Sequence, residues 1–205
     1  MVQSTNQYNT MKKVLLLLFI AASTLSLQAQ KGKSKSPKSN PPLAKLDNVT
    51  VEVKEGNYQI TINENGVPKD AIVIKSVDAK FAPTNCLLKS FKANGVTLYL
   101  LTWSEKVTIK TDLKTEVSTT NNSNIYDISA KKQVFANAQT TTEITEKVFL
   151  DKNKTVSETQ QRKRKEGMEF VLNPDGSVVQ KAKSQDNKWT YNTTKMEYVE
   201  VKKKK

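Results

Sequence analysis

The sequence predicts an all-β protein built from antiparallel hairpins and meanders, with a sheet that closes as a sandwich, a jelly-roll or an open barrel. Two observations carry this prediction. Short runs of alternating apolar and polar residues recur along residues 46–201, and this period of two is typical of half-buried strands. Glycines stand at the boundaries of these runs, where turns need them, at Gly56, Gly66, Gly95, Gly167 and Gly176.

The alternating runs in the first half predict strands at residues 49–53, 58–62, 71–74, 87–91 and 96–103. The connections Asn63–Gly66 and Lys92–Gly95 both end in Asn-Gly. That pair supplies the positive φ angles that tight hairpin turns require. We therefore expect antiparallel hairpins on either side of these turns.

The second half is rich in threonine and β-branched residues, which favour strands. The predicted strands there are residues 106–110, 115–119, 124–128, 133–136, 143–145 and 147–150. Residues 157–166 have no apolar face and are predicted either as a helix or as a long exposed hairpin extension. A third hairpin joins 168–172 to 177–180 through Asn173–Gly176, and strands at 189–191 and 196–201 complete the domain.

Residues 11–29 predict a secretory signal peptide. Lys12 and Lys13 precede the apolar run 14–22, and the polar residues that follow end this run before it reaches the length of a membrane anchor. We expect cleavage near Ala29, and its junction with the following glutamine resembles secretory signals common in one large group of Gram-negative bacteria.

The expected product is an exported protein, periplasmic or extracellular, with no transmembrane span in the mature chain. Because residues 1–10 are polar and would separate the basic segment from the terminus, we expect them to be a start-site artefact, with Met11 as the start. The mature chain then begins with a basic, proline-containing segment at residues 30–45. We expect this segment to be a disordered linker before a single β-rich domain at residues 46–201.

The net charge of +13, from 33 Lys and Arg against 20 Asp and Glu, is concentrated at the ends of the chain. Residues 46–201 hold 22 basic and 20 acidic side chains, whereas the linker carries five lysines and the tail at residues 202–205 four, with no acidic side chain in either segment. A nearly neutral body without a basic, aromatic face argues against nucleic acid as a partner.

Composition excludes several chemistries. The chain has no histidine, which removes His-dependent nucleophilic catalysis, His-ligated zinc and imidazole proton shuttles. Cys86 is the single cysteine, so no intrachain disulfide or thiolate metal site can form, and we expect it to be a small buried side chain rather than a reactive thiol. We therefore predict no enzyme and no catalytic, cofactor-binding or metal-binding residues. Carboxylate-pair glycoside hydrolysis remains as the alternative.

Two cationic groups are candidates for contact with an anionic envelope polymer or a lipid headgroup, although either can instead be merely solvated. They are Arg162, Lys163, Arg164 and Lys165, and the tail Lys202, Lys203, Lys204 and Lys205. The aromatic residues Tyr99, Trp103, Trp189, Tyr191 and Tyr198 could line a carbohydrate platform. Their apolar neighbours instead favour core positions and cross-strand pairs.

Residues Asn124–Ala138 resemble the strand–turn–strand units of periplasmic lipopolysaccharide-transport β-jelly-roll proteins. This resemblance implies an envelope protein whose sheet carries or contacts an amphiphile. The main expectation is an exported, non-enzymatic, β-rich envelope protein that acts by binding or as a structural component. The alternatives are a periplasmic carrier of a lipid or amphiphile and a carboxylate-dependent glycoside hydrolase.

Overall fold

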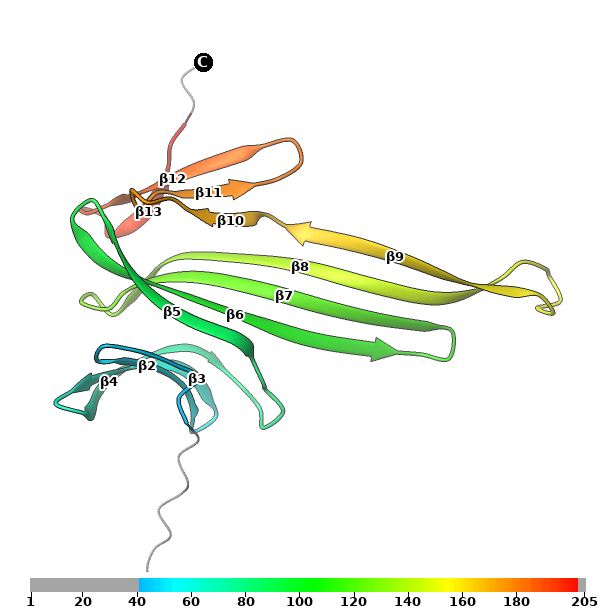
Figure 1. The fold of residues 1–205 in the computed structure, drawn as a ribbon, viewed down its shortest axis with the longest axis horizontal. Helices are drawn as coiled ribbons and strands as arrows, with labels where there is room; N and C mark the ends of the chain where they lie inside the picture. Colours follow the sequence, from blue (N-terminus) through cyan, green and yellow to red (C-terminus); the bar gives the residue numbers. More distant parts are fainter. Residues whose placement is uncertain (1–40, 203–205) are drawn as a thin grey trace, which may run out of the picture. The chain divides into compact units, whose positions relative to one another are not determined.

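Thirteen antiparallel strands and no helix make up the part of the chain that the computed structural model describes, residues 41–202 (Figure 1). The all-β prediction is confirmed, and the strands form three sheets. The predicted signal peptide at 11–29, the start-site segment 1–10, linker residues 30–40 and the tail lysines Lys203, Lys204 and Lys205 lie outside the described residues.

The N-terminal sheet is a meander of four strands in chain order. These are β1 (Ala44–Leu46), β2 (Val49–Lys54), β3 (Asn57–Glu64) and β4 (Val67–Ser76). The predicted Asn-Gly turn connects β3 to β4, with positive φ at both Asn65 and Gly66. The first strand begins at Ala44, within the segment predicted as linker.

The central sheet contains the longest strands. They are β5 (Thr84–Ala93), β6 (Val96–Lys110), β7 (Lys114–Asp127), β8 (Lys132–Phe149) and β9 (Ser157–Gly167). The short strands predicted between residues 96 and 150 merge into β6, β7 and β8. Residues 157–166 belong to β9, so the hairpin extension is the correct alternative for this segment and the helix is wrong.

The C-terminal sheet is a second meander, again in chain order. Its strands are β10 (Glu169–Leu172), β11 (Val178–Lys181), β12 (Asp186–Asn192) and β13 (Glu197–Glu200). The predicted turn Asn173–Gly176 precedes β11, and the backbone N–H of Asn173 donates to the carbonyl of Ser177 at 2.9 Å.

Two apolar clusters lie on opposite faces of the central sheet. Because successive side chains of a strand point to opposite faces, Leu98 and Leu100 of β6 enter one cluster while Leu101 and Trp103 enter the other. The Trp103 cluster includes side chains of β2 and β3, such as Tyr58. The Leu98 cluster instead contains side chains of β11, β12 and β13, so each meander packs against the central sheet.

The candidate aromatic platform is part of these clusters. Trp103, Tyr191 and Tyr198 are buried, and Tyr99 and Trp189 pack against the same cores. Cys86 also packs against the Trp103 cluster, and burial raises the pKa of its thiol. These aromatic residues therefore occupy core positions. Within residues 41–202, no helix has the length and hydrophobicity that crossing a bilayer requires.

Candidate functional site

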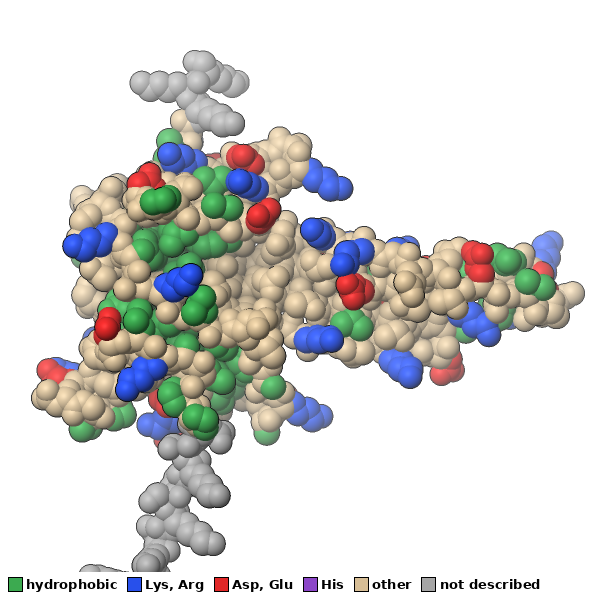
Figure 2. Space-filling model, viewed as in Figure 1, with side chains coloured by type: hydrophobic (Ala, Val, Ile, Leu, Met, Phe, Trp, Pro, Cys, Tyr) green, Lys and Arg blue, Asp and Glu red, His purple; other side chains and the backbone are tan. Residues whose placement is uncertain are grey.

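The outer parts of β6–β9 lie beyond both apolar clusters and form an arm (Figures 1 and 2). We define the arm as residues 105–121 and 139–167. Its pairing register is continuous, from the row Glu105–Thr120–Thr140–Glu166 outward to the pair of Phe149 with Ser157. Every side chain of β9 is exposed. Burial of apolar side chains, which holds the two meanders on the central sheet, therefore does not account for the length of β9.

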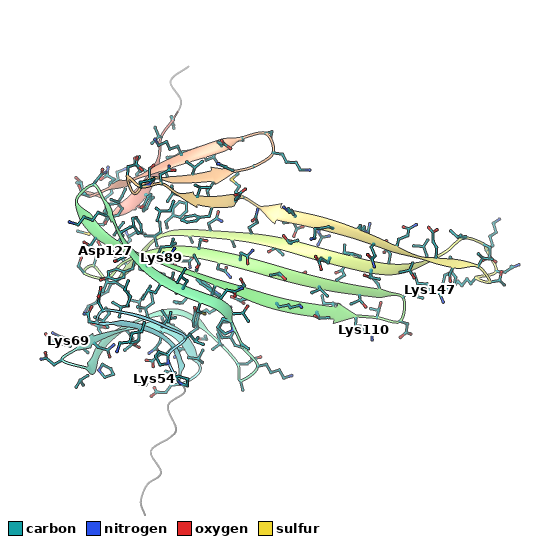
Figure 3. The ribbon with its side chains drawn as sticks, viewed as in Figure 1. Lys54, Lys69, Lys89, Lys110, Asp127 and Lys147 are labelled. Carbon is teal, nitrogen blue, oxygen red and sulfur yellow. The ribbon has the colours of Figure 1, made fainter. Side chains whose placement is uncertain are left out.

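One face of the arm is dominated by lysine. The register and the alternation of side chains place five lysines and one acidic side chain there, a net charge of +4. The members of this lysine face are Lys106, Lys110, Lys147, Lys163, Lys165 and Glu143. Figure 3 labels Lys110 and Lys147 on the outer portions of β6 and β8.

Within residues 41–202, only one of these lysines pairs with a carboxylate, since Lys163 lies 2.9 Å from Glu143. The hydrogen bond and charge of Lys163 lower the pKa of Glu143, and the charge of Lys106 lowers it further. This influence of Lys106, two strands away, agrees with its place on the same face. The remaining lysines leave the face strongly positive.

The opposite face of the arm, the paired face, has a different electrostatic character. It carries five acidic side chains, Glu105, Glu116, Glu146, Glu158 and Glu166, and three basic ones, Lys114, Arg162 and Arg164. Each basic side chain has a carboxylate partner: Lys114 with Glu116, Arg162 with Glu146, and Arg164 with Glu166. The hydrogen bond from Lys114 lowers the pKa of Glu116, with further effects from Arg164 and Arg162.

The cationic run predicted as a single contact site is therefore divided between the two faces. Arg162 and Arg164 lie on the paired face, while Lys163 and Lys165 lie on the lysine face. Lys202, the first residue of the basic tail, is exposed just after β13, and the described part of the chain contains none of the other tail lysines.

Sequence reasoning missed Lys106, Lys110 and Lys147. These residues are isolated in the sequence and become neighbours only through the pairing of β6, β7 and β8. The i,i+4 spacing of Lys106 and Lys110 would place both on one face of a strand, and this was the available signal. Their alignment with Lys163 and Lys165 depends on cross-strand register, which one sequence does not reveal.

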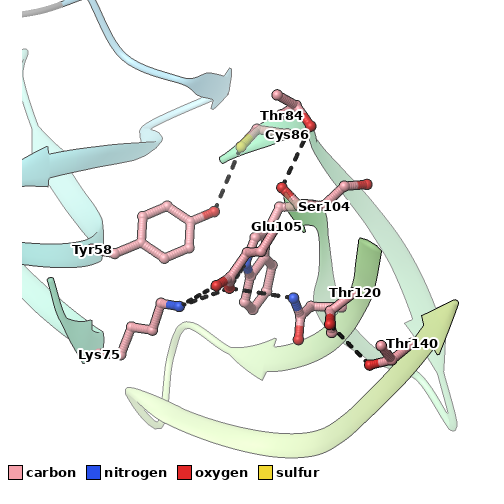
Figure 4. A network of polar contacts seen from close by, with 10 residues as sticks. Tyr58, Lys75, Thr84, Cys86, Ser104, Glu105, Thr120 and Thr140 are labelled. Carbon is pink, nitrogen blue, oxygen red and sulfur yellow. Dashed lines mark hydrogen bonds and ion pairs between the residues drawn. The ribbon is translucent and has the colours of Figure 1, made fainter. Parts of the chain in front are cut away.

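At the base of the arm, a hollow of about 330 Å³ is lined by Lys75, Phe81, Glu105 and neighbouring residues. Lys75 on β4 donates to both carboxylate oxygens of Glu105 on β6, at 2.7 Å each (Figure 4). The indole N–H of Trp103 donates to the same carboxylate at 2.7 Å, and the Asn122 amide donates at 3.4 Å. The Lys75 ammonium also lies 4.4 Å from the centre of the Phe81 ring.

This arrangement makes Glu105 a connection between sheets. Its carboxylate is surrounded by donors and paired with a cation, whereas a glycosidase acid needs a protonated carboxyl and a second carboxylate across the cleft. A second ion pair joins Asp70 on β4 to Lys131, in the turn between β7 and β8. The hollow therefore lies beside a structural contact between β4 and the central sheet.

Compared with known proteins, the chain matches no protein family, no curated protein and no solved structure at a significant level.

Proposed function

We propose that this chain is an exported, non-enzymatic protein of the bacterial envelope, and that it attaches to an anionic envelope surface through the lysine face of its arm. The observation that carries the proposal is the unequal charge of the two faces. One face presents five lysines against a single glutamate, whereas every basic side chain on the other has a carboxylate partner.

The dimensions of the lysine face suit a broad surface contact. From Lys106 to the level of Lys147 the strands advance six residues, or about 20 Å, and from β6 to β9 the sheet is about 14 Å wide. Threonine side chains lie between the lysines, namely Thr108, Thr115, Thr119, Thr141, Thr145 and Thr159. Their hydroxyls can donate to phosphate or carboxylate oxygens.

The expected attraction is substantial because the charges act together. A lysine close to an anionic surface contributes about 1 kcal/mol to the free energy of binding. This contribution decays with distance from the surface over a Debye length, which is about 8 Å at physiological salt. Five lysines reduced by one glutamate therefore supply up to about 4 kcal/mol. A contact of this strength is reversible and sensitive to salt.

The alternatives have weaker support. An amphiphile carrier would be supported by an enclosed apolar cavity, whereas the hollows at Lys75 and at Thr145 are open and lined by charged side chains. A glycoside hydrolase would be supported by a free acid in a cleft, whereas Glu105 is engaged by Lys75 and Trp103. For the fold, we infer stacked open sheets rather than a barrel, because each sheet has a linear strand order.

The test compares two triple variants that remove the same number of positive charges from the arm. The first, K106Q/K110Q/K165Q, removes three of the five lysines of the lysine face, and its matched control, K114Q/R162Q/R164Q, removes the three basic side chains of the paired face. Binding of the purified full chain to dextran sulfate resin and to isolated envelope particles is measured at about 50 mM and about 500 mM salt.

The lysine-face variant should bind at least about tenfold more weakly at low salt, whereas the control should lose less than about threefold. Equal losses would show that only net charge matters, and unchanged binding by both would show that the arm is not the contact. Either result would overturn the proposal. Circular dichroism and thermal unfolding of each variant verify that the sheets remain folded.

A further inference from the structure

The outermost strand of the arm, β9, has a free edge within residues 41–202. The strand order β5–β6–β7–β8–β9 places it beyond β8, along one side of the arm (Figure 1). All of its side chains, from Ser157 to Gly167, are exposed. A strand in this position presents a row of unpaired backbone N–H and C=O groups, which can pair with another strand.

The hydrogen bonds of the β8–β9 ladder show which residues face the free edge. The N–H of Leu150 donates to the carbonyl of Val156 at 3.0 Å, and the register continues from this pair without a shift to Gln139 with Gly167. In an antiparallel ladder, every second residue of a strand turns both backbone groups to the same neighbour. Even-numbered residues of β9 therefore pair with β8. The backbone groups that point outward belong to Ser157, Thr159, Gln161, Lys163 and Lys165.

The free edge of β9 is more regular than the edges of β4 and β5, the other long edge strands. β4 contains Pro68 and has two register shifts against β3, and β5 has a register shift before Leu87. Prolines and bulges discourage the pairing of edge strands with other chains. β9 contains no proline and keeps a constant register, so its backbone is suited to pairing.

The loop at residues 150–156 fixes the beginning of β9. The carboxylate of Asp151 accepts hydrogen bonds from the N–H and hydroxyl of Thr155, at 3.1 and 2.6 Å, and from the N–H of Val156 at 2.8 Å. These donors lower the pKa of Asp151 to about 2. Because the strand is ordered before it meets a partner, pairing costs little further conformational entropy.

We infer that the free edge of β9 binds a second copy of this chain, with the two β9 strands antiparallel around a two-fold axis at Gln161. This inference goes beyond the proposed function and does not depend on it. Residues 157–165 of each copy pair, and every outward-facing residue donates one hydrogen bond and accepts one across the interface. The two central sheets become one continuous sheet.

The charges of β9 are self-complementary in this register. Glu158 lies opposite Arg164 of the other copy, and the two-fold symmetry makes this pair occur twice. Lysines on an edge strand discourage pairing when like charges meet. Here neutral side chains face them, with Thr159 opposite Lys163 and Ser157 opposite Lys165.

Repulsion between the copies is limited because carboxylates of the same chain partner three of the four cations of β9. These ion pairs are Lys163 with Glu143, Arg162 with Glu146 and Arg164 with Glu166. The guanidinium of Arg164 has five N–H donors, so it can contact Glu166 and also Glu158 of the other copy.

Other ways of pairing the edge are less favourable. An axis at Arg162 would place the two copies of this arginine opposite each other, and Glu158 opposite Glu166. An axis at Gln160 would shorten the pairing to residues 157–163. The edge of β6 is free only beyond Ser104, at residues 105–110, and its pairing with β9 would not close a two-fold dimer.

The dimer places both lysine faces on one side of the joined sheet. A two-fold axis between neighbouring antiparallel strands is perpendicular to their sheet, so it preserves the faces. The cationic surface of the proposed function would therefore be wider in the dimer than in a single copy.

Two lysine substitutions in one row of the arm test the interface. Gln161→Lys sets two lysines opposite each other at the two-fold axis. The matched control Thr145→Lys adds the same charge on the same face of β8, because Thr145 pairs with Gln161. Sedimentation equilibrium of the full chain from about 1 µM to about 1 mM measures the dimer dissociation constant. It should rise at least about tenfold for Gln161→Lys and less than about threefold for Thr145→Lys.

A cysteine at the two-fold axis tests the register. With the single native cysteine removed by Cys86→Ala, the substitution Gln161→Cys places two thiols on residues whose Cα atoms lie about 5.5 Å apart, within the range of a disulfide. Mild oxidation should link this variant into dimers. The control Thr145→Cys, one strand away from the interface, should remain unlinked.

The outcomes separate the dimer from the proposed function. A chain that is monomeric at every concentration would overturn the inference. Equal effects of the two lysine substitutions, or equal cross-linking of the two cysteine variants, would also overturn it. Binding to dextran sulfate is measured separately, so its absence would overturn the proposed function while leaving the dimer in place. Circular dichroism verifies that each variant remains folded.

Discussion

Replacement of Gly176 by alanine tests how the C-terminal sheet packs on the central sheet. Gly176 has a φ of +78°, and an added Cβ would lie 2.5 Å from the carbonyl oxygen of Lys92 and 2.7 Å from Ala93 Cα and Cβ. Ala93 is buried, and the Tyr198 hydroxyl donates to the Gly176 carbonyl at 2.8 Å. The new methyl group therefore meets backbone that cannot move without separating the turn from β5.

The cost has two parts. The left-handed conformation of a residue with a Cβ costs about 1 kcal/mol, and forcing an extra methyl group into a packed site costs a further ~1–3 kcal/mol. We expect Gly176→Ala to lower the free energy of unfolding by about 2–4 kcal/mol. Gly66 is the matched control because its φ is +79° and its added Cβ would meet nothing within 4 Å, so Gly66→Ala should cost only about 1 kcal/mol.

Urea denaturation of the full chain, followed by tryptophan fluorescence and circular dichroism, measures both costs. Trp189 lies in the C-terminal sheet and Trp103 in the cluster on the other face, so coincident transitions also indicate whether the sheets unfold together. Equal costs for the two alanine variants would refute the close contact of the Gly176 turn with β5.

Three further predictions concern single side chains. Glu105→Gln should lower the free energy of unfolding by about 1–2 kcal/mol, because it weakens the contacts with Lys75 and Trp103. The expected loss is small because Lys75 and Glu105 are partly exposed to solvent, which screens their ion pair. An unchanged urea midpoint would contradict this prediction. The low pKa of Asp151 means that its stabilisation of the loop is complete above the unfolded pKa of about 3.9 and is lost as pH falls towards about 2. The protection of residues 150–156 against hydrogen exchange, measured relative to the intrinsic exchange rate at each pH, should therefore decrease over that range, and Asp151→Asn should abolish this pH dependence. Because burial raises the pKa of Cys86, its alkylation should be slow in the folded chain and fast in urea, and equal rates would contradict its burial.

The sequence was most informative where side chains have a buried face or where backbone geometry demands a particular residue. The turns at Gly66, Gly95 and Gly176 could be located because their positive φ angles favour glycine. The run Leu98–Leu101 contains apolar residues in succession because both faces of β6 are covered there. Burial and turn chemistry therefore predict strands and hairpins well.

The arm was difficult to predict for the opposite physical reason. Side chains of β9 are all exposed, so its apolar pattern carries no signal for a strand, and backbone pairing with β8 determines its structure. The same register decides which lysines share a face. The cationic run at 162–165 was visible in the sequence, but its division between two faces, and its alignment with Lys106 and Lys110, follow from three strand pairings.

A lysine acetylation footprint tests attachment through the lysine face most directly. The full chain is labelled with an amine-reactive acetylating reagent in the presence and absence of phosphatidylglycerol vesicles, and modification of each lysine is measured by mass spectrometry. We expect unchanged labelling of the exposed Lys54, Lys69 and Lys195 in the two meanders, with protection of the lysine face, Lys106, Lys110, Lys147, Lys163 and Lys165. Protection of the meander lysines without protection of the arm lysines would contradict this mode of attachment.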